Sequence, residues 1–330
     1  MYKLEINDLK ELNLFLNLND LEYVDLFLSR GKSILVSNTA ELFAALSLYT
    51  ECSADESSAN IRLPRKMLAS LVCEGNIVIK VKENEVVLLF YANDQTQERY
   101  SVTLGRQEVF SASYDKKIQI LSEIDNANRF NAGDIKDIVN IGRAASSVIS
   151  CQNGVASVTL VGRGRVFKTI EFKNSFAVSA ARLSRLLSVS NTLFDIENYV
   201  GVATKELSIL ATKSRGSDNS DYELIQQEKS NVVFEANFEN LYVFLAKINI
   251  NLENITVNLD RRCCDIEESN KKYSIPVTIT NLKRVGTVSE IKIPYYVFKT
   301  VLLHKTHNML KFSNTRNFIR VVLGDLVLAF

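Results

Sequence analysis

Two short stretches of this 330-residue chain carry residue types that could bind a metal ion or a phosphate group. "HKTH" holds the only histidines, His304 and His307, and their spacing could place two imidazoles on one helix face. A zinc site needs further ligands, and neither a cysteine nor a carboxylate lies close by in the sequence. "VGRGRVFK" (161–168) combines glycines with basic residues, but it lacks the GKS or GKT ending of a P-loop. We therefore expect no metal site, and we interpret the second stretch as a hairpin turn rich in Gly and Arg.

The cysteines give no support to nucleophilic chemistry. They form no CxxC pair, and an odd number without a spacing pattern indicates reduced thiols in a cytosolic compartment. The five are Cys52, Cys73, Cys151, Cys263 and Cys264. With two histidines in the whole chain, no Ser-His-Asp or Cys-His arrangement has local support. We expect a binding protein without a cofactor, and not an enzyme.

Basic residues without acidic neighbours offer a different chemistry, the sequence-independent attraction of phosphate groups. Three ten-residue segments, "LPRKMLASLV", "VSAARLSRLL" and "IPYYVFKTVL", contain no Asp or Glu. Their basic residues, with one just beyond the third segment, are Arg65, Lys66, Arg182, Arg185, Lys299 and Lys305. Lys plus Arg is 39 against 38 for Asp plus Glu, so any preference for an anionic partner must come from such local charge. A solvated helix face explains any single lysine equally well, but three acid-free segments need a common cause.

The same three segments recur at equal spacing and read as amphipathic helices. They begin at Leu63, Val178 and Ile293, each 115 residues after the last. Aligned in this register, Leu68, Leu183 and Phe298 share a column, and further apolar columns follow at i+3 and i+4. Pro64, Ser179 and Pro294 share the column that suits a helix N-terminus.

Matching strands follow each of these helices, and a second helix precedes each of them. The strands are "IVIKV", "VVLLFY" and "RYSVTL" in the first copy, "LFDIE", "LSILATK" and "YELIQQ" in the second, and "MLKFS", "FIRVVL" and "LVLAF" in the third. The other helices are predicted in "INDLKELNLFL" from Ile6, "FNAGDIKDIVN" from Phe130 and "FEANFENLYVFLAK" from Phe234. The chain thus has six helix-plus-strands units of about 55 residues, a repeat length that indicates an array of like units. Chance similarity of amphipathic helices and a solenoid are the alternatives.

Three copies of a two-part domain, each part a helix with a small antiparallel sheet, resemble the bacterial and phage DNA polymerase sliding clamps over the whole chain. The resemblance implies an α+β fold with three tandem clamp domains, 1–110, 111–228 and 229–330. It implies that sheets form an outer wall, that helices line a central hole, and that two chains close head to tail around duplex DNA. Such a ring is a non-enzymatic processivity factor for a DNA polymerase, and a clamp loader opens it.

The resemblance also implies two sets of site residues. The DNA-facing set is the basic residues of the six helices, Arg65, Lys66, Lys136, Arg143, Arg182, Arg185, Lys247, Lys299 and Lys305. The partner-peptide pocket has one wall from the Gly-basic-apolar turn at Gly164, Arg165 and Val166. Its other wall comes from the end of the chain, at Leu326, Val327, Leu328 and Phe330. Polymerase and loader are expected to insert short apolar peptides there.

Two features depart from the family pattern and keep other functions open. The helices that begin near Ile6, Phe130 and Phe234 mix acids with their lysines, and the net charge of +1 is near neutral where clamps are usually acidic. Both features favour the alternative of a clamp-fold accessory factor for transcription or recombination that does not encircle DNA. An enzyme or structural protein with three similar domains is the third possibility, which a bound cofactor or nucleotide would promote.

The start of the chain and the length of its apolar runs bear on localisation. The start, "MYKLEINDLKEL", is charged and periodic, unlike a signal peptide. No run approaches the roughly 18 apolar residues that cross a bilayer. We expect a soluble cytoplasmic protein with no membrane partner.

Overall fold

The fold is described from a computed structural model. It describes the backbone of all residues except 6–8, 19–20, 53–57, 75, 92–97, 108, 110–113, 161–163, 217–218, 249–251, 269–270 and 299–308. The described chain forms two compact units, one of Met1–Gly133 with Arg185–Lys213 and the other of Asp134–Ser184 with Ser214–Phe330. The division into three domains near residues 110 and 228 stays a prediction.

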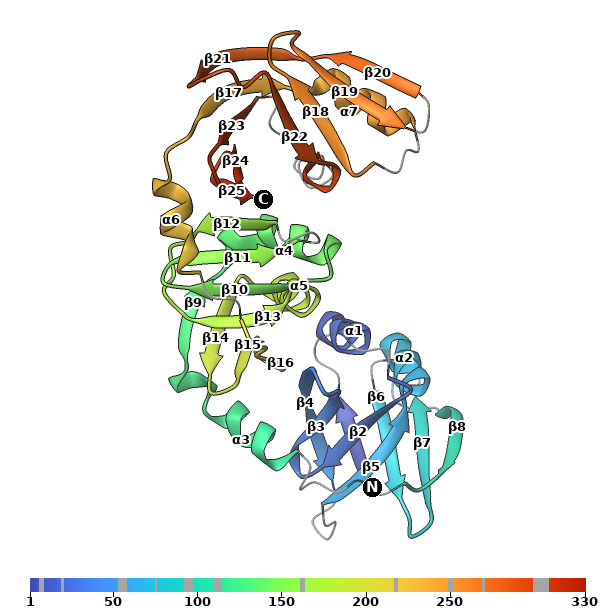
Figure 1. The fold of residues 1–330 in the computed structure, drawn as a ribbon. Coiled ribbons are helices and arrows are strands. Elements are labelled where there is room, and N and C mark those ends of the chain that lie inside the picture. The colour runs from blue at the N-terminus through green and yellow to red at the C-terminus, as the bar shows by residue number, and fades with distance from the viewer. Residues whose placement is uncertain are drawn as a thin grey trace. The chain divides into compact units, whose positions relative to one another are not determined.

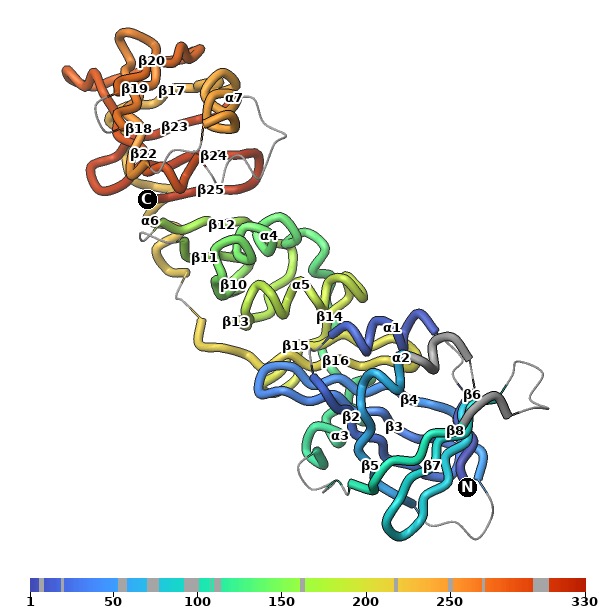
Figure 2. Tube along the Cα trace, turned by 90° about the vertical axis from the view of Figure 1, so that its right-hand side faces the viewer, coloured from blue at the N-terminus to red at the C-terminus, as the bar shows by residue number. Residues whose placement is uncertain are grey.

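The first unit holds a twelve-stranded antiparallel sheet with helices α1 and α2 side by side (Figures 1 and 2). Its first half contains β1 (Tyr2–Glu5), α1 (Leu9–Leu18), β2 (Tyr23–Leu28), β3 (Gly31–Asn38), β4 (Leu42–Cys52), β5 (Ala59–Pro64) and α2 (Arg65–Glu74). It continues with β6 (Asn76–Val81), β7 (Glu85–Tyr91), β8 (Glu98–Gly105), α3 (Asp115–Ser122), the short 3-10 helix η2 (Ile124–Asn126) and β9 (Asn128–Asn131). The later segment adds β14 (Thr192–Ile196), β15 (Tyr199–Ala203) and β16 (Leu207–Thr212).

The second unit holds a nine-stranded and a four-stranded antiparallel sheet. Its first segment contains α4 (Lys136–Ala144), β10 (Val148–Gln152), β11 (Val155–Thr159), β12 (Arg165–Thr169) and β13 (Phe176–Ser179), and α5 (Ala180–Val189) crosses the division between the units. There follow α6 (Asp221–Gln227), β17 (Val232–Asn237), α7 (Glu239–Lys247), β18 (Asn254–Asn258), β19 (Cys263–Glu268), β20 (Lys271–Pro276), β21 (Thr278–Arg284) and β22 (Glu290–Pro294). Residues 295–298 are helical, and β23 (Leu310–Asn314), β24 (Ile319–Leu323) and β25 (Leu326–Ala329) end the chain.

One strand pairing occurs three times in the same register. The strand that follows each first helix pairs with the strand that precedes each second helix, giving the antiparallel pairs β2–β5, β10–β13 and β18–β22. The first pair of residues in these ladders is Tyr23 with Pro64, Val148 with Ser179 and Asn254 with Pro294. In each copy the second helix begins at the very next residue, as the predicted N-terminal column requires.

The apolar columns of the sequence register are equivalent in the fold as well. Leu68, Leu183 and Phe298 are each the fourth residue of their helix, and their exposed fractions are 2%, 0% and 1%. A second ladder repeats in the same way, because the strand before each first helix pairs with the strand after each second helix, in β1–β6, β9–β14 and β17–β23. The repeated register therefore reflects a repeated three-dimensional unit.

The structure corrects two details of the predicted elements. "YELIQQ" is the helix α6 and not a strand, because β15, which was not predicted, is the second strand of the meander and β16 already completes it as the third. Phe130 and Phe234 lie in β9 and β17, so the helices after them begin later than predicted. An asparagine starts each turn into the helix: the side-chain oxygen of Asn131 accepts the Gly133 N–H at 2.9 Å, and that of Asn237 accepts the Glu239 N–H at 2.8 Å.

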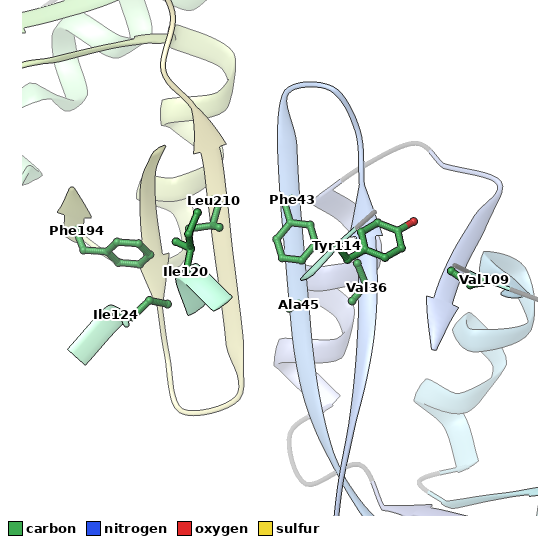
Figure 3. Close-up of a cluster of buried hydrophobic side chains, with 9 residues drawn as sticks. All are labelled: Val36, Phe43, Ala45, Val109, Tyr114, Ile120, Ile124, Phe194 and Leu210. Carbon is green, nitrogen blue, oxygen red and sulfur yellow. The ribbon is translucent and has the colours of Figure 1, made fainter. Parts of the chain in front are cut away.

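The helices α3 and α6 each cover a junction between two strands from distant parts of the chain. In the first unit, α3 packs its Ile120 on an apolar cluster that includes Phe43 of β4 and Leu210 of β16 (Figure 3). In the second unit, Ile225 of α6 packs on Phe167 of β12 and Val327 of β25. The strand pairs β4–β16 and β12–β25 are thus equivalent junctions, each closed by a short helix.

Candidate nucleic-acid interface and partner pocket

The basic residues predicted to face DNA lie on the polar sides of their helices wherever the structure describes them. Lys66 of α2, Lys136 and Arg143 of α4, Arg185 of α5 and Lys247 of α7 are exposed. Arg65 of α2 and Arg182 of α5 are half-buried. Lys299 and Lys305 lie outside the described residues.

Helix α5 shows how the sequence separates the apolar and basic sides. Leu183, Leu186 and Leu187 are buried at i, i+3 and i+4, while Arg182 and Arg185 fall between them on the other face. Arg185 Nη1 donates a hydrogen bond to the carbonyl oxygen of Leu18, the last residue of α1. The carbonyl groups in the last turn of a helix receive no hydrogen bond from within the helix, and Arg185 supplies a donor for this one. A guanidinium carries five N–H donors, and one such contact leaves it able to bind phosphate.

Asp137 in the first turn of α4 and Asp134 just before the helix are both engaged within the second unit. Asp137 Oδ2 lies 2.8 Å from Nζ of Lys168, and Asp134 Oδ2 accepts the N–H of Glu171 at 3.2 Å. Glu235, which the sequence places in the following first-half helix, lies in β17 and accepts a hydrogen bond from Asn281. For α4 the sequence therefore overstates the negative charge beside the exposed basic residues, whereas α7 keeps the exposed Glu239 in its first turn.

The two predicted walls of the partner pocket are neighbouring strands of one sheet. Strand β12 pairs antiparallel with β25, with Val166 opposite Leu328 and Arg165 opposite Ala329. Val166, Leu328 and Val327 are buried within this junction. Phe330 continues the pairing of β25 with β24. Its N–H donates to the carbonyl oxygen of Ile319 at 3.1 Å, and its carbonyl oxygen accepts the N–H of Ile319 at 2.8 Å. Residues far apart in the sequence thus meet at one short ladder.

Tyr296 belongs to this site although the sequence argument did not name it. Its ring meets that of Phe330 edge-on, with centroids 6.3 Å apart and an angle of 72° between the planes. A Cβ added to Gly164 would overlap the Tyr296 hydroxyl, so any larger residue at that position would have to displace the Tyr296 ring. Burial raises the pKa of Tyr296, so the phenol stays neutral at physiological pH. In the sequence register Tyr296 occupies the column of Lys66, and this change from basic to aromatic is the signal that could have identified it.

Arg165 is bound by the segment that leads into α6. Its Nη1 lies 2.5 Å from Asp221 Oδ2, and its Nη2 donates to the side-chain oxygen of Asn219 at 3.0 Å. The guanidinium also stacks on Phe167, 4.7 Å from the ring centroid. These contacts indicate that Arg165 fixes α6 on the junction, and its predicted contact with a partner peptide stays a prediction.

The other sequence candidates for chemistry gain no support from the structure. The described residues contain no group of three or more metal-ligating side chains, and His304 and His307 lie outside them. Cys52, Cys151, Cys263 and Cys264 are free thiols, and burial raises the pKa of Cys151 and Cys264, which disfavours their reactive thiolate forms. Among the helices that the structure describes, none has the length and apolar character to span a bilayer.

Comparison with known proteins identifies the fold. No protein-family model and no curated protein matches the chain by sequence. Among solved structures, a putative DNA polymerase III beta subunit from Eubacterium rectale matches with a TM-score of 0.69 and 12% identity, over 100% of this chain and 99% of that one. A DNA polymerase sliding clamp from Pseudomonas aeruginosa gives 0.67 and 12%, over 100% and 98%. The beta subunit from Thermotoga maritima gives 0.65 and 8%, over the same shares. The chain has the α+β fold of these clamps along its whole length, as the sequence predicted.

Proposed function

We propose that this protein is a DNA sliding clamp, a ring that encircles duplex DNA and tethers a DNA polymerase to its template. The observation that carries the proposal is the threefold repeat of one ladder-and-helix unit, in the fold of DNA polymerase III beta subunits, with exposed basic residues on the helices. The protein acts in the bacterial or phage-infected cytoplasm as a binding partner and not as an enzyme. Polymerase, clamp loader and duplex DNA are its proposed partners.

Ring closure follows from the strands that remain at sheet edges. Within the chain, β4 pairs with β16 and β12 pairs with β25. By the repeat, β20 is the counterpart of β4 and β12, and β8 is the counterpart of β16 and β25. Both β20 and β8 are terminal strands of their sheets among the described residues. Pairing β20 of one copy with β8 of a second copy, at both ends, gives a closed homodimer of six similar domains.

The proposed mechanism is topological. A closed ring needs no tight contact to stay on DNA, so weak attraction between phosphates and residues such as Lys66, Arg143 and Arg182 suffices. Such contacts carry no base information, and the ring therefore meets no sequence-specific barrier as it slides. Three-domain organisation with boundaries near 110 and 228 is part of the proposal, because each domain then contributes two helices to the inner wall.

The junction of β12 with β25 is the proposed docking site for partners. Phe330 and Tyr296, which are partly exposed, would bind the apolar side chains of a short peptide, while Gly164, Val166 and Leu328, which are buried, would support them from within the junction. One pocket of this kind on each subunit would let polymerase and loader use the same ring in turn.

One observation favours a second function. The net charge of +1 gives the outer surface little repulsion for DNA, which suits a clamp-fold accessory factor that binds a transcription or recombination protein without encircling the duplex. Solution mass measured together with negative-stain images separates the two proposals. A dimer mass with a ring supports the clamp, and a monomer mass without rings at high protein concentration supports the accessory factor.

A further inference from the structure

The two equivalent junctions of the chain are built from different chemistry. In the first unit, Phe43 of β4 lies opposite Leu210, and Leu46 lies opposite Leu207, the first residue of β16. The corresponding positions in β12 are Arg165, opposite Ala329, and Lys168, opposite Leu326, the first residue of β25. These two positions are therefore apolar in the first junction, whereas in the second junction each of them carries a cation.

Lys168 joins three elements of the second unit. The residue is 7% exposed, and its Nζ lies 2.8 Å from Asp137 of α4 and 2.9 Å from Asp325 in the turn before β25. Burial lowers the pKa of Lys168, but the hydrogen bonds that its ammonium group donates to both carboxylates outweigh this effect, and the pKa lies above its usual value. The amine is thus charged at neutral pH. A buried cation of this kind is stable only while its partners stay in place.

Asp325 lies in the turn between β24 and β25 and is tied to β12 by Lys168. Its side chain is 64% exposed, and its Oδ2 pairs with the same Nζ that binds Asp137 of α4. Asp325 directly precedes Leu326, so the ion pair fixes the residue from which β25 enters its ladder with β12. On its other side β25 pairs with β24 along its whole length, from Leu326 opposite Leu323 to Ala329 opposite Arg320, and the backbone bonds of Phe330 with Ile319 continue that ladder.

We propose that Lys168 is a positioning residue for the partner-peptide pocket, holding β25 in register on β12 through Asp325. The inference rests on the proposed function, because the pocket is where a partner peptide would bind. Lys168 itself touches no peptide. Its effect on binding passes through the placement of Leu326–Phe330, the wall that follows Asp325.

The test uses the full-length protein and its Lys168→Met, Lys168→Arg and Lys213→Met variants. Methionine fills the space but leaves Asp137 and Asp325 as neighbouring like charges, whereas arginine keeps the cation. Lys213 makes a matched partly buried ion pair with Asp195 in the first unit, so its variant controls for the loss of such a pair. One readout is amide hydrogen exchange of β25, and the other is binding of fluorescein-labelled hexapeptides rich in Leu and Phe.

We expect Lys168→Met to speed exchange in β25 and to weaken peptide binding by about tenfold, because removing one partner of a buried ion pair is strongly destabilising. Lys168→Arg should restore most of the binding, and Lys213→Met should leave binding and β25 exchange unchanged. A further substitution of Asp325→Asn in the Lys168→Met variant should recover part of the loss, since it removes the repulsion. Equal binding by wild type and Lys168→Met would overturn the positioning role alone. Absence of peptide binding by the wild type would overturn the pocket, and the positioning role with it.

Discussion

At the scale of single residues, the basic side chains could be assigned to helix faces from the sequence, but their contacts could not. The spacing of Leu183, Leu186 and Leu187 fixes the buried face of α5 and so places Arg182 and Arg185 off it. The hydrogen bond from Arg185 to Leu18 joins residues 167 positions apart, and no local pattern encodes it. The same holds for Arg165, whose pairing with Asp221 depends on where the chain crosses after β16.

Replacing Arg182 by Ala tests one member of the DNA-facing set. The substitution removes one cation from a half-buried position outside the apolar stripe of α5. The salt dependence of DNA binding should weaken, with the slope of log K against log salt falling by up to about 0.9 for one lost phosphate contact. Lys292→Ala is the control, since Lys292 is exposed on β22 between the buried Ile291 and Ile293. An unchanged slope for Arg182→Ala would remove this residue from the set.

Gly164→Ala tests the predicted pocket at its tightest point. The new Cβ would overlap the Tyr296 hydroxyl and displace the ring that contacts Phe330. Peptide binding measured by fluorescence anisotropy should fall, and Tyr296→Phe in the same chain should restore part of it, because it removes the atom in the way. If Gly164→Ala bound the peptides as wild type does, the pocket would lie elsewhere.

At the scale of elements, the sequence register found the repeated helices and most strands, and the errors have local causes. Apolar and polar residues alternate in part of "YELIQQ", which suggested a strand. In the structure the segment is a helix, and Tyr222 and Ile225, spaced three residues apart, pack on apolar residues of β12 and β25. Phe130 and Phe234 match the apolar period of a helix, but the asparagine turns that follow each of them delay the helix start. Periodicity alone cannot decide which of two adjoining elements a buried aromatic residue belongs to.

Helix α6 should depend on anchors at its two ends. Asp221 binds Arg165 at the N-terminal end, and Nη1 of Arg320 donates to the carbonyl oxygens of Ile225 and Gln226 at 2.8 and 2.9 Å. We expect Asp221→Asn to lower the free energy of unfolding by about 1 kcal/mol, a modest value because the carboxylate is partly exposed. Urea unfolding of the variant beside Glu223→Gln, an exposed acid of the same helix, measures the difference. Equal losses for both variants would mean that the anchor contributes nothing specific.

At the scale of the whole molecule, the repeat determines which strands remain at sheet edges without a partner from the next domain. The chain closes two of its junctions internally and leaves β20 and β8 as edges. Edge strands expose unpaired backbone groups that favour association with another strand. The composition of β20 agrees with an edge position, because "KKYSIP" carries two lysines and a proline where the junction strands "LSILAT" and "LVLA" are almost wholly apolar.

Proline substitution on β20 should therefore dissociate the proposed dimer. Alternate N–H groups of an edge strand point away from the sheet, so one of Tyr273→Pro and Ser274→Pro removes an outward donor. That variant should sediment as a monomer while keeping the circular dichroism of the wild type. Retention of the dimer mass by both variants would exclude β20 as the contact.

The central claim is that the protein encircles DNA, and the most direct test is whether a covalently closed protein ring stays threaded on circular DNA. Thr103→Cys on β8 and Ser274→Cys on β20 allow a bismaleimide to join the two proposed contact strands after the protein has been mixed with a nicked circular duplex. The account predicts that protein cross-linked in this way stays with the circle through denaturing detergent and high salt, and is released when a restriction enzyme cuts the DNA once. Loss of the protein from the intact circle under those conditions, or failure of the two strands to cross-link, would contradict it.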